Sequence, residues 1–237
     1  MSKVLGLGGI ILGVVVLGTP INALGGPIKG DIKLGYVASS GNSESESLAF
    51  TSKFGFEREG LSHKFSLDVF SGAQNGTTSA ERYTAAYQVN TEITATQSAF
   101  GRIDYDDDRF SGFDYQAAAT IGLTSKWSVP EGHTLTTDVG VGMRSSKLSL
   151  GGSEDEGIIR LAAAYALVVN DNSKFEQTLS ADIGEESTIS KAVSSYSVAI
   201  SDALSLDVGL HFKHVSEPAF GAKSLDRETT VSLAYSF

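Results

Sequence analysis

The chain has 237 residues, of which 41% are hydrophobic and 19% charged, and its mean hydropathy is -0.00. It is therefore too polar to be a bundle of membrane helices. The net charge of -10 offers no basic patch for phosphates, so we expect no nucleic-acid partner. Cysteine is absent, which excludes disulfides, thiolate nucleophiles and thiolate metal sites. The 26 glycines, 12 phenylalanines and 8 tyrosines favour strands and tight turns.

The first segment has the pattern of a secretory signal peptide. In "MSKVLGLGGIILGVVVLGTPINA", Lys3 precedes an apolar run over 4–17, and small residues lead to Ala23. This order predicts a signal peptide over 1–23 with cleavage after Ala23. The alternative is an anchoring helix, but the run is shorter than the ~20 apolar residues that a span needs. We expect the mature chain, 24–237, to form a single domain.

Apolar and polar residues alternate through the rest of the chain, as they do in half-buried strands. In chain order, the alternation is clearest within 28–39, 48–57, 64–69, 82–90, 100–106, 113–127, 135–144, 159–169, 175–183, 195–200, 204–213 and 229–237, and it predicts one strand around each of these stretches. The segment 100–106 is the least clear, and there Ile103 and Tyr105 mark the apolar side. We therefore expect about 12 strands.

The expected connections are of two alternating kinds. Five short ones include "EGLS" (59–62) and "PEGH" (130–133), and six longer polar ones include "SGAQNGTTS", "DDDRFSG" and "EPAFGAKS". Their alternation puts both chain ends on the side of the short turns. Outer-membrane up-and-down barrels have this pattern, with short periplasmic turns and longer external loops.

A soluble β-sandwich would use the same alternation, but strand length favours a barrel. The expected strands have about 11 to 14 residues, whereas ~5–6 is usual in globular proteins. Eleven residues tilted by ~45° rise roughly 26 Å, the height of an outer-membrane apolar band. Aromatic residues gather near strand ends, as membrane-interface girdles require: Phe56, Phe113, Tyr115, Trp127, Phe175, Phe212 and Tyr235. We predict an all-β fold: a single closed antiparallel up-and-down transmembrane β-barrel of about 12 strands.

The final strand, "RETTVSLAYSF", supports the same location. In lipid, unpaired backbone groups at a sheet edge are costly, so the last strand must close on the first. Tyr235 and Phe237 would then face lipid, as in the assembly signal that barrel-assembly machinery recognises. We expect that machinery, outer-membrane lipid and lipopolysaccharide as partners in the cell outer membrane. The alternative is an ordinary final strand.

Two segments carry a resemblance to a known family. "LGYVASSGNSESESLAFTSKFGFERE" at 34–59 resembles the opening strand, turn and strand of the YdiY-like, salt-stress-induced outer-membrane protein family, with Ser43 where threonine is usual. "YDDDRFSGFDYQAAATIGLTSKW" at 105–127 resembles its acidic, aromatic hairpin. The resemblance implies a barrel in the outer membrane and a link to salt or osmotic stress. It supplies no active site.

Charged residues opposite the apolar faces would line the barrel interior. We expect there Lys53, Asp68, Arg82, Arg102, Asp104, Lys126, Asp138, Arg144, Arg160, Glu176, Asp182 and Asp207, with Glu57, Glu92 and Lys213 beside them. Barrels of eight strands are filled by side chains, whereas sixteen strands leave an aqueous channel. About 12 strands leave two alternatives, a narrow channel and a largely closed structural barrel.

Two acidic clusters lie where external loops are expected. One holds Asp104 and Asp106 to Asp108, and the other is 154–156. We interpret both as solvated loop charges, with weak divalent bridging to lipid headgroups as the alternative. We expect no dedicated metal site and no cofactor.

One pair of residues suggests an alternative function. His214 and Ser216 would share the lipid-facing side of a strand, as do the His-x-Ser pairs of outer-membrane lipid deacylases and phospholipases. A serine nucleophile needs a histidine base and a third orienting group, and no such group can be assigned. The prediction is therefore a non-enzymatic envelope protein, with a lipid hydrolase as the alternative.

Overall fold

The computed structural model describes residues 27–39 and 44–237. The expected signal peptide, 1–23, lies outside the described residues. Among these residues, no helix has the length and apolar character that a membrane span requires.

Twelve strands account for most of the described chain. Their bounds are β1 (Lys29–Ser39), β2 (Ser45–Arg58), β3 (Leu61–Gln74), β4 (Thr77–Glu92), β5 (Gln97–Asp108), β6 (Phe113–Lys126), β7 (His133–Leu148), β8 (Ser153–Asn170), β9 (Ser173–Gly184), β10 (Thr188–Ala199), β11 (Leu204–Val215) and β12 (Leu225–Ser236). They run from 11 to 18 residues, well above the ~5–6 usual in globular proteins. Most have the predicted 11 to 14 residues, and β4, β7 and β8 are longer.

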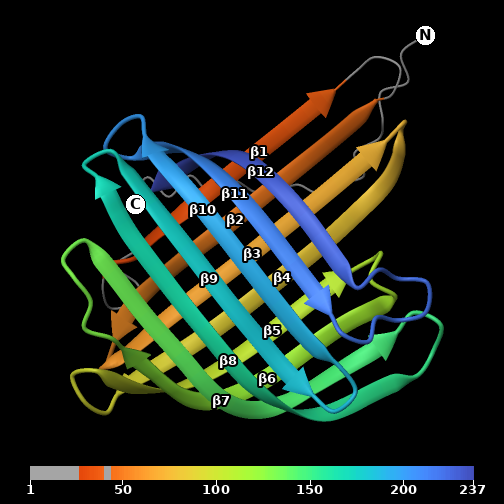
Figure 1. Cartoon of the computed structure of the whole chain (residues 1–237), viewed down its shortest axis with the longest axis horizontal. Coiled ribbons are helices and arrows are strands. Elements are labelled where there is room, and N and C mark those ends of the chain that lie inside the picture. Colours follow the sequence, from red (N-terminus) through yellow and green to blue (C-terminus); the bar gives the residue numbers. More distant parts are fainter. Residues whose placement is uncertain (1–26, 40–43) are drawn as a thin grey trace.

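The strands form one closed antiparallel barrel, in which each pairs with its neighbours in sequence and β1 pairs with β12 (Figure 1). The predicted fold class and strand number are confirmed. Closure continues past β12, because Gly30 and Phe237 exchange two backbone hydrogen bonds of 3.0 Å. We call this end of the barrel the closure end and the opposite end the loop end.

The two faces of the wall are sorted by parity. Outward positions carry exposed apolar side chains, such as Ile121 and Met143 at 67% and 65% exposure. Inward positions carry buried polar ones, and Arg144 and Asp207 are each only 3% exposed. The distribution is therefore the reverse of that in a soluble protein, with apolar groups outside and polar groups inside.

The connections differ from the prediction. The segment "SGAQNGTTS" was expected as a loop, but β3 and β4 run through it and leave only a turn at Asn75 and Gly76, both at positive φ. The long strands absorb most of the expected loops. Among the connections at the loop end that the structure describes in full, only that between β11 and β12, residues 216–224, is extended. The predicted contrast between short and long connections is therefore wrong for most of the barrel.

Two aromatic residues also differ from the expected alternation. Phe113 is 6% exposed, because the register of β6 shifts between Phe113 and Tyr115. The shift leaves Asp114 exposed, where its carboxylate forms an ion pair with Lys147. Phe100 faces inward and is 4% exposed. Glycines opposite make room for its ring: a Cβ built on Gly140 would lie 3.0 Å from Phe100 Cζ.

Candidate functional site

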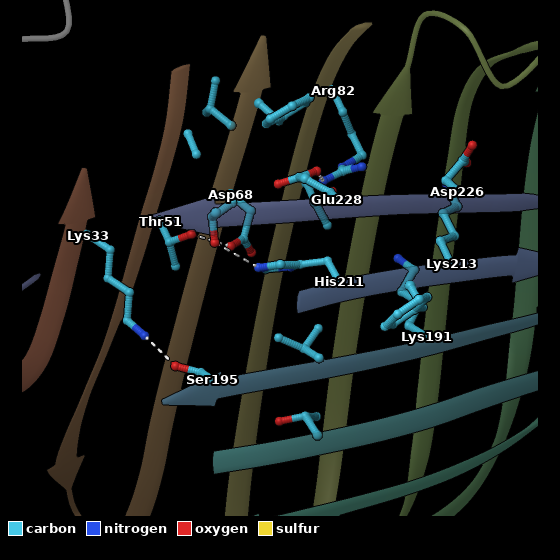
Figure 2. Close-up of a pocket in the computed structure, with 18 of the residues that line it drawn as sticks. Lys33, Thr51, Asp68, Arg82, Lys191, Ser195, His211, Lys213, Asp226 and Glu228 are labelled. Atoms are coloured by element: carbon cyan, nitrogen blue, oxygen red, sulfur yellow. Dashed lines mark hydrogen bonds and ion pairs between the residues drawn. The ribbon is translucent and has the colours of Figure 1, made fainter. Parts of the chain in front are cut away.

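The barrel encloses a cavity of about 700 Å³. Inward side chains of β1 to β4 and β10 to β12 supply most of its polar lining, shown in Figure 2. Charges of both signs and several hydroxyl groups converge there because inward positions on these strands are polar. The cavity volume lies within the ~300–1,000 Å³ typical of ligand pockets.

Ion pairs cross the barrel interior at this cavity. Asp106 on β5 accepts a hydrogen bond of 2.9 Å from Lys191 on β10 and one of 3.1 Å from Lys213 on β11. Asp108 Oδ2 lies 3.8 Å from the same Lys213 Nζ. In a ring of twelve strands, β5 and β11 lie directly opposite each other. We call these four residues the cross-barrel bridge.

A second ion pair spans the interior nearby. Arg82 Nη2 on β4 donates to Glu228 Oε2 on β12 at 2.7 Å, and β4 and β12 are four strands apart. The guanidinium also lies over the inward-facing ring of Phe70, 5.7 Å from its centroid. Figure 2 shows Arg82 and Glu228 meeting end to end. The pair therefore adds a fourth and a fifth strand, β4 and β12, to the three strands that the cross-barrel bridge joins.

The cross-barrel bridge shows that the barrel is flattened at this level. Twelve strands spaced ~4.8 Å apart and tilted ~40° would form a circle roughly 24 Å in diameter. A lysine and an aspartate joined by the 3.1 Å bond span at most roughly 13 Å from Cα to Cα. The walls that carry Asp106 and Lys213 are therefore much closer together than in a round barrel, and the interior is narrow.

The remaining ion pairs of the described residues join groups on the same strand or on strands at most two apart. Lys33 Nζ donates to Asp207 Oδ2 at 2.9 Å, and Ser197 Oγ donates to the same oxygen at 2.6 Å. Arg160 Nη1 donates to both oxygens of Asp182, on the adjacent strand. These pairs lie along the wall, so among the ion pairs of the described residues only the cross-barrel bridge and Arg82–Glu228 cross the interior.

The opposite part of the interior is filled. Phe100 occupies the space beside the glycines of β6 and β7. Around it, Asn90 on β4 donates a hydrogen bond to Thr124 on β6, which donates one to Asp138 on β7. Arg102 on β5 donates to both Gln88 and Asp104. These side chains link β4 to β7. The main cavity therefore lies away from this cluster, with most of its polar lining on β1 to β4 and β10 to β12.

A second cavity of about 250 Å³ continues toward the closure end. It is lined by the β8–β9 turn, where Asn172 lies, and by Ser236 of the final strand. Lys33 and Glu176 line both cavities. The two cavities therefore adjoin at these residues, and the cross-barrel bridge lies in the larger one.

The structure places the predicted interior residues in three settings. Lys53, Asp68, Arg82, Glu176 and Asp207 line the main cavity. Charged contacts along the wall involve Arg102, Asp104, Arg144, Arg160 and Asp182, while Asp138 accepts from Thr124. Lys126 lies at the end of β6, where its 53% exposed side chain pairs with Glu92. The prediction therefore located charged inward positions without showing which of them meet.

Several residues of the site were misplaced or missed. Asp106 and Asp108 were interpreted as solvated loop charges, but β5 extends through both and they face inward. Glu156 is also buried, at 8% exposure, and accepts from Arg144 and from the backbone N–H of Glu186. That interpretation is wrong for these three. Parity would have found Asp106, since Ile103 and Tyr105 mark the outward side.

The His-x-Ser pair gains no support as a catalytic centre. His214 is exposed at the end of β11, and Ser216 follows in the next connection. The Ser216 hydroxyl accepts a hydrogen bond of 2.9 Å from the backbone N–H of Thr188. Among the described side chains, no hydrogen bond joins His214 to Ser216. The serine therefore ties β10 to the final connection.

No cluster of three or more metal-binding side chains occurs in the part of the chain that the structure describes. Three of the acidic residues near the loop end, Asp106, Asp108 and Glu156, lie in ion pairs with lysine or arginine.

Comparison with known proteins gives a family and several structural likenesses. The model of a family described as "Protein of unknown function, DUF481" matches residues 32–237. The chain is 29% identical over 211 residues to "Uncharacterized protein YdiY" of Escherichia coli (strain K12), covering 89% of this chain and 83% of that protein. The resemblance drawn from the two sequence segments is confirmed.

Solved structures with a similar outline are barrels. The NanC porin aligns with a TM-score of 0.49 and 10% identity, covering 88% of this chain and 98% of that one. The KdgM porin gives 0.44 and 10%, over 88% and 99% of the two chains. The translocator domain of the autotransporter NalP from Neisseria meningitidis gives 0.42 and 16%, over 89% and 88%.

Proposed function

We propose that this chain, which belongs to the DUF481 family of proteins of unknown function, is an outer-membrane β-barrel that forms a narrow passage for small hydrophilic solutes. It carries out no chemistry on them. Ion pairs across the interior limit its conductance, and their sensitivity to salt connects the barrel to osmotic stress.

The apolar outer face supports a membrane location. Exposed apolar side chains run along successive outward positions of one strand, such as Leu206, Val208 and Leu210 on β11. Such a face recurs around the barrel, and soluble monomers rarely expose contiguous apolar patches above a few hundred Å². Closure of the sheet also satisfies most backbone groups internally, as a hydrocarbon environment demands. Lipid solvates such a surface at no cost.

The observation that carries the proposed function is the cross-barrel bridge. It lies in the larger of two joined polar cavities, and it holds opposite walls close together. A purely structural barrel of this size could fill its interior with apolar or neighbouring-strand contacts. Charges placed across a hydrated space instead limit its width and can separate to widen it.

The test is conductance of the purified, refolded protein in planar lipid bilayers. We expect small, stable current steps in about 0.1 M KCl. Between about 0.1 and 1 M the Debye length falls from ~10 to ~3 Å, which weakens exposed ion pairs. The Lys191 side chain is 38% exposed, so screening reaches it. Conductance should therefore rise more steeply than the conductivity of the bulk solution.

Two results would contradict the proposal. The absence of any stable current would identify a closed structural barrel. A conductance strictly proportional to the conductivity of the bulk solution would show that salt does not widen the passage.

A further inference from the structure

The seam that closes the barrel is paired over only part of its length. β1 pairs with β12 from Asp31↔Ser236 to Leu34↔Leu233, and the pairing then stops. Residues 35–39 of β1 still pair with β2, and residues 225–232 of β12 still pair with β11. Figure 1 shows β1 and β12 diverging toward the loop end. Among the described residues, two strand edges therefore face each other across an unpaired wedge.

The main cavity reaches this wedge. It is lined by the consecutive residues 226–230 of β12. This run lies beyond the last paired position of the seam, so the unpaired part of β12 borders the cavity. The two strands are still in contact at Gly35, where a Cβ would lie 2.7 Å from the carbonyl oxygen of Val231. The wedge therefore begins beyond that level, toward the loop end.

On the interior wall beside the wedge, apolar side chains form a strip among polar ones, which we call the apolar wall. Ala49 on β2 and Phe70 on β3 are direct cross-strand partners, and both line the cavity with Ala80 of β4. Val37 on β1, which has inward parity and is 50% exposed, extends the strip toward the wedge. The facing wall holds Lys191 and Lys213. An apolar strip on one side of the interior therefore faces charged side chains on the other.

We propose that the unpaired part of the seam is a lateral portal for a single-chain amphiphile, such as a fatty acid or a lysophospholipid. Its hydrocarbon chain enters between β1 and β12 and lies against Val37, Ala49 and Phe70. Its polar head group lies among the charged side chains of the facing wall. The cavity volume of about 700 Å³ suits a ligand of this size.

The geometry favours an amphiphile over a peptide strand or a second copy of the chain. An added strand is held by backbone hydrogen bonds along an edge. The edges of β1 and β12 diverge, so one strand cannot pair along both. Water in the cavity can satisfy the β12 edge, while the apolar wall gains from a hydrocarbon chain. The portal does not depend on whether the interior conducts ions.

Tryptophan quenching tests the binding site. The chain has one tryptophan, Trp127, so the variant Trp127→Phe has no tryptophan fluorescence of its own. In it, Phe70→Trp reports on the apolar wall, and Thr178→Trp reports on the far wall of the same cavity. A dibrominated fatty acid, added to protein in vesicles of ordinary phosphatidylcholine, should quench the tryptophan at 70 saturably and at least threefold more than that at 178. Equal or negligible quenching at the two positions would overturn the site.

Disulfide formation tests the portal, and because the chain has no native cysteine, only the introduced cysteines can form a disulfide. Leu34→Cys with Leu233→Cys lies at a paired seam position and should oxidise almost completely. Val37→Cys with Thr230→Cys would be partners if the pairing continued, and we expect less than a tenth of that yield. Equal yields would show a closed seam and overturn the portal, as would a cross-linked dimer formed through position 230. Heat-modifiable gel mobility verifies that each variant is folded.

Discussion

Replacing Asp106 with asparagine should separate the two functions of the cross-barrel bridge, namely stability and obstruction. The carboxylate accepts hydrogen bonds from Lys191 at 2.9 Å and from Lys213 at 3.1 Å. Each charged hydrogen bond contributes ~1.5–3 kcal/mol. Lys191 is 38% exposed and regains water, and Lys213 keeps Asp108 at 3.8 Å, so the full sum is not lost. We expect Asp106→Asn to lower the free energy of unfolding by about 3 kcal/mol.

The same change should at least double the single-channel conductance, because the two lysines are released from the opposite wall. Unfolding in urea can be followed by the fluorescence of Trp127, and conductance in planar bilayers. The matched control is Asp182→Asn, which breaks the pair between Arg160 on β8 and Asp182 on the adjacent strand β9. That variant should lose similar stability without gaining conductance. Equal conductance of the two variants would refute the obstruction by the bridge.

Three further variants test other parts of the barrel. Glu156→Gln should lower the free energy of unfolding by about 3 kcal/mol, because Glu156 binds both the buried Arg144 and the backbone of Glu186. Proteolysis of the 185–187 connection should then be faster, and an unchanged rate of cleavage would argue against this anchoring. Phe100→Ala should lower unfolding free energy by ~3–5 kcal/mol in urea, and a loss below about 1 kcal/mol would mean that the ring fills no space. Phe237→Ala should slow the appearance of the heat-modifiable form in cells, while the free energy of unfolding of assembled barrels stays within ~1.5 kcal/mol of the wild-type value. Assembly at the normal rate would show that Phe237 is not part of the assembly signal.

Alternation predicted the barrel well because one physical rule acts on every strand. Most inward positions carry polar side chains and most outward positions carry apolar ones, so parity persists over many residues. Ile103 and Tyr105 identified the outer side even in the least regular strand, and they are 59% and 41% exposed. The same parity places Phe100 inward, but the room for an aromatic ring there depends on Gly122 and Gly140 of other strands, which the local pattern does not show.

The site itself depended on information that parity does not contain. Charges near an expected loop, such as Asp106 and Asp108, were assigned to solvent because the strands were expected to end earlier. Which charges meet across the interior depends on the shape of the barrel cross-section, and local sequence carries no record of it. The register at the seam cannot be predicted from local sequence either, because the pairing of β1 with β12 joins residues about 200 positions apart.

The partition of the native protein in cells tests the central claim, that the apolar outer face of a closed barrel is solvated by lipid. Cells that produce the full chain are fractionated, and the outer-membrane fraction is run on gels with and without heating. The account predicts that the protein is found in that fraction and migrates faster when unheated. Recovery in the aqueous fraction, with the same mobility before and after heating, would contradict it.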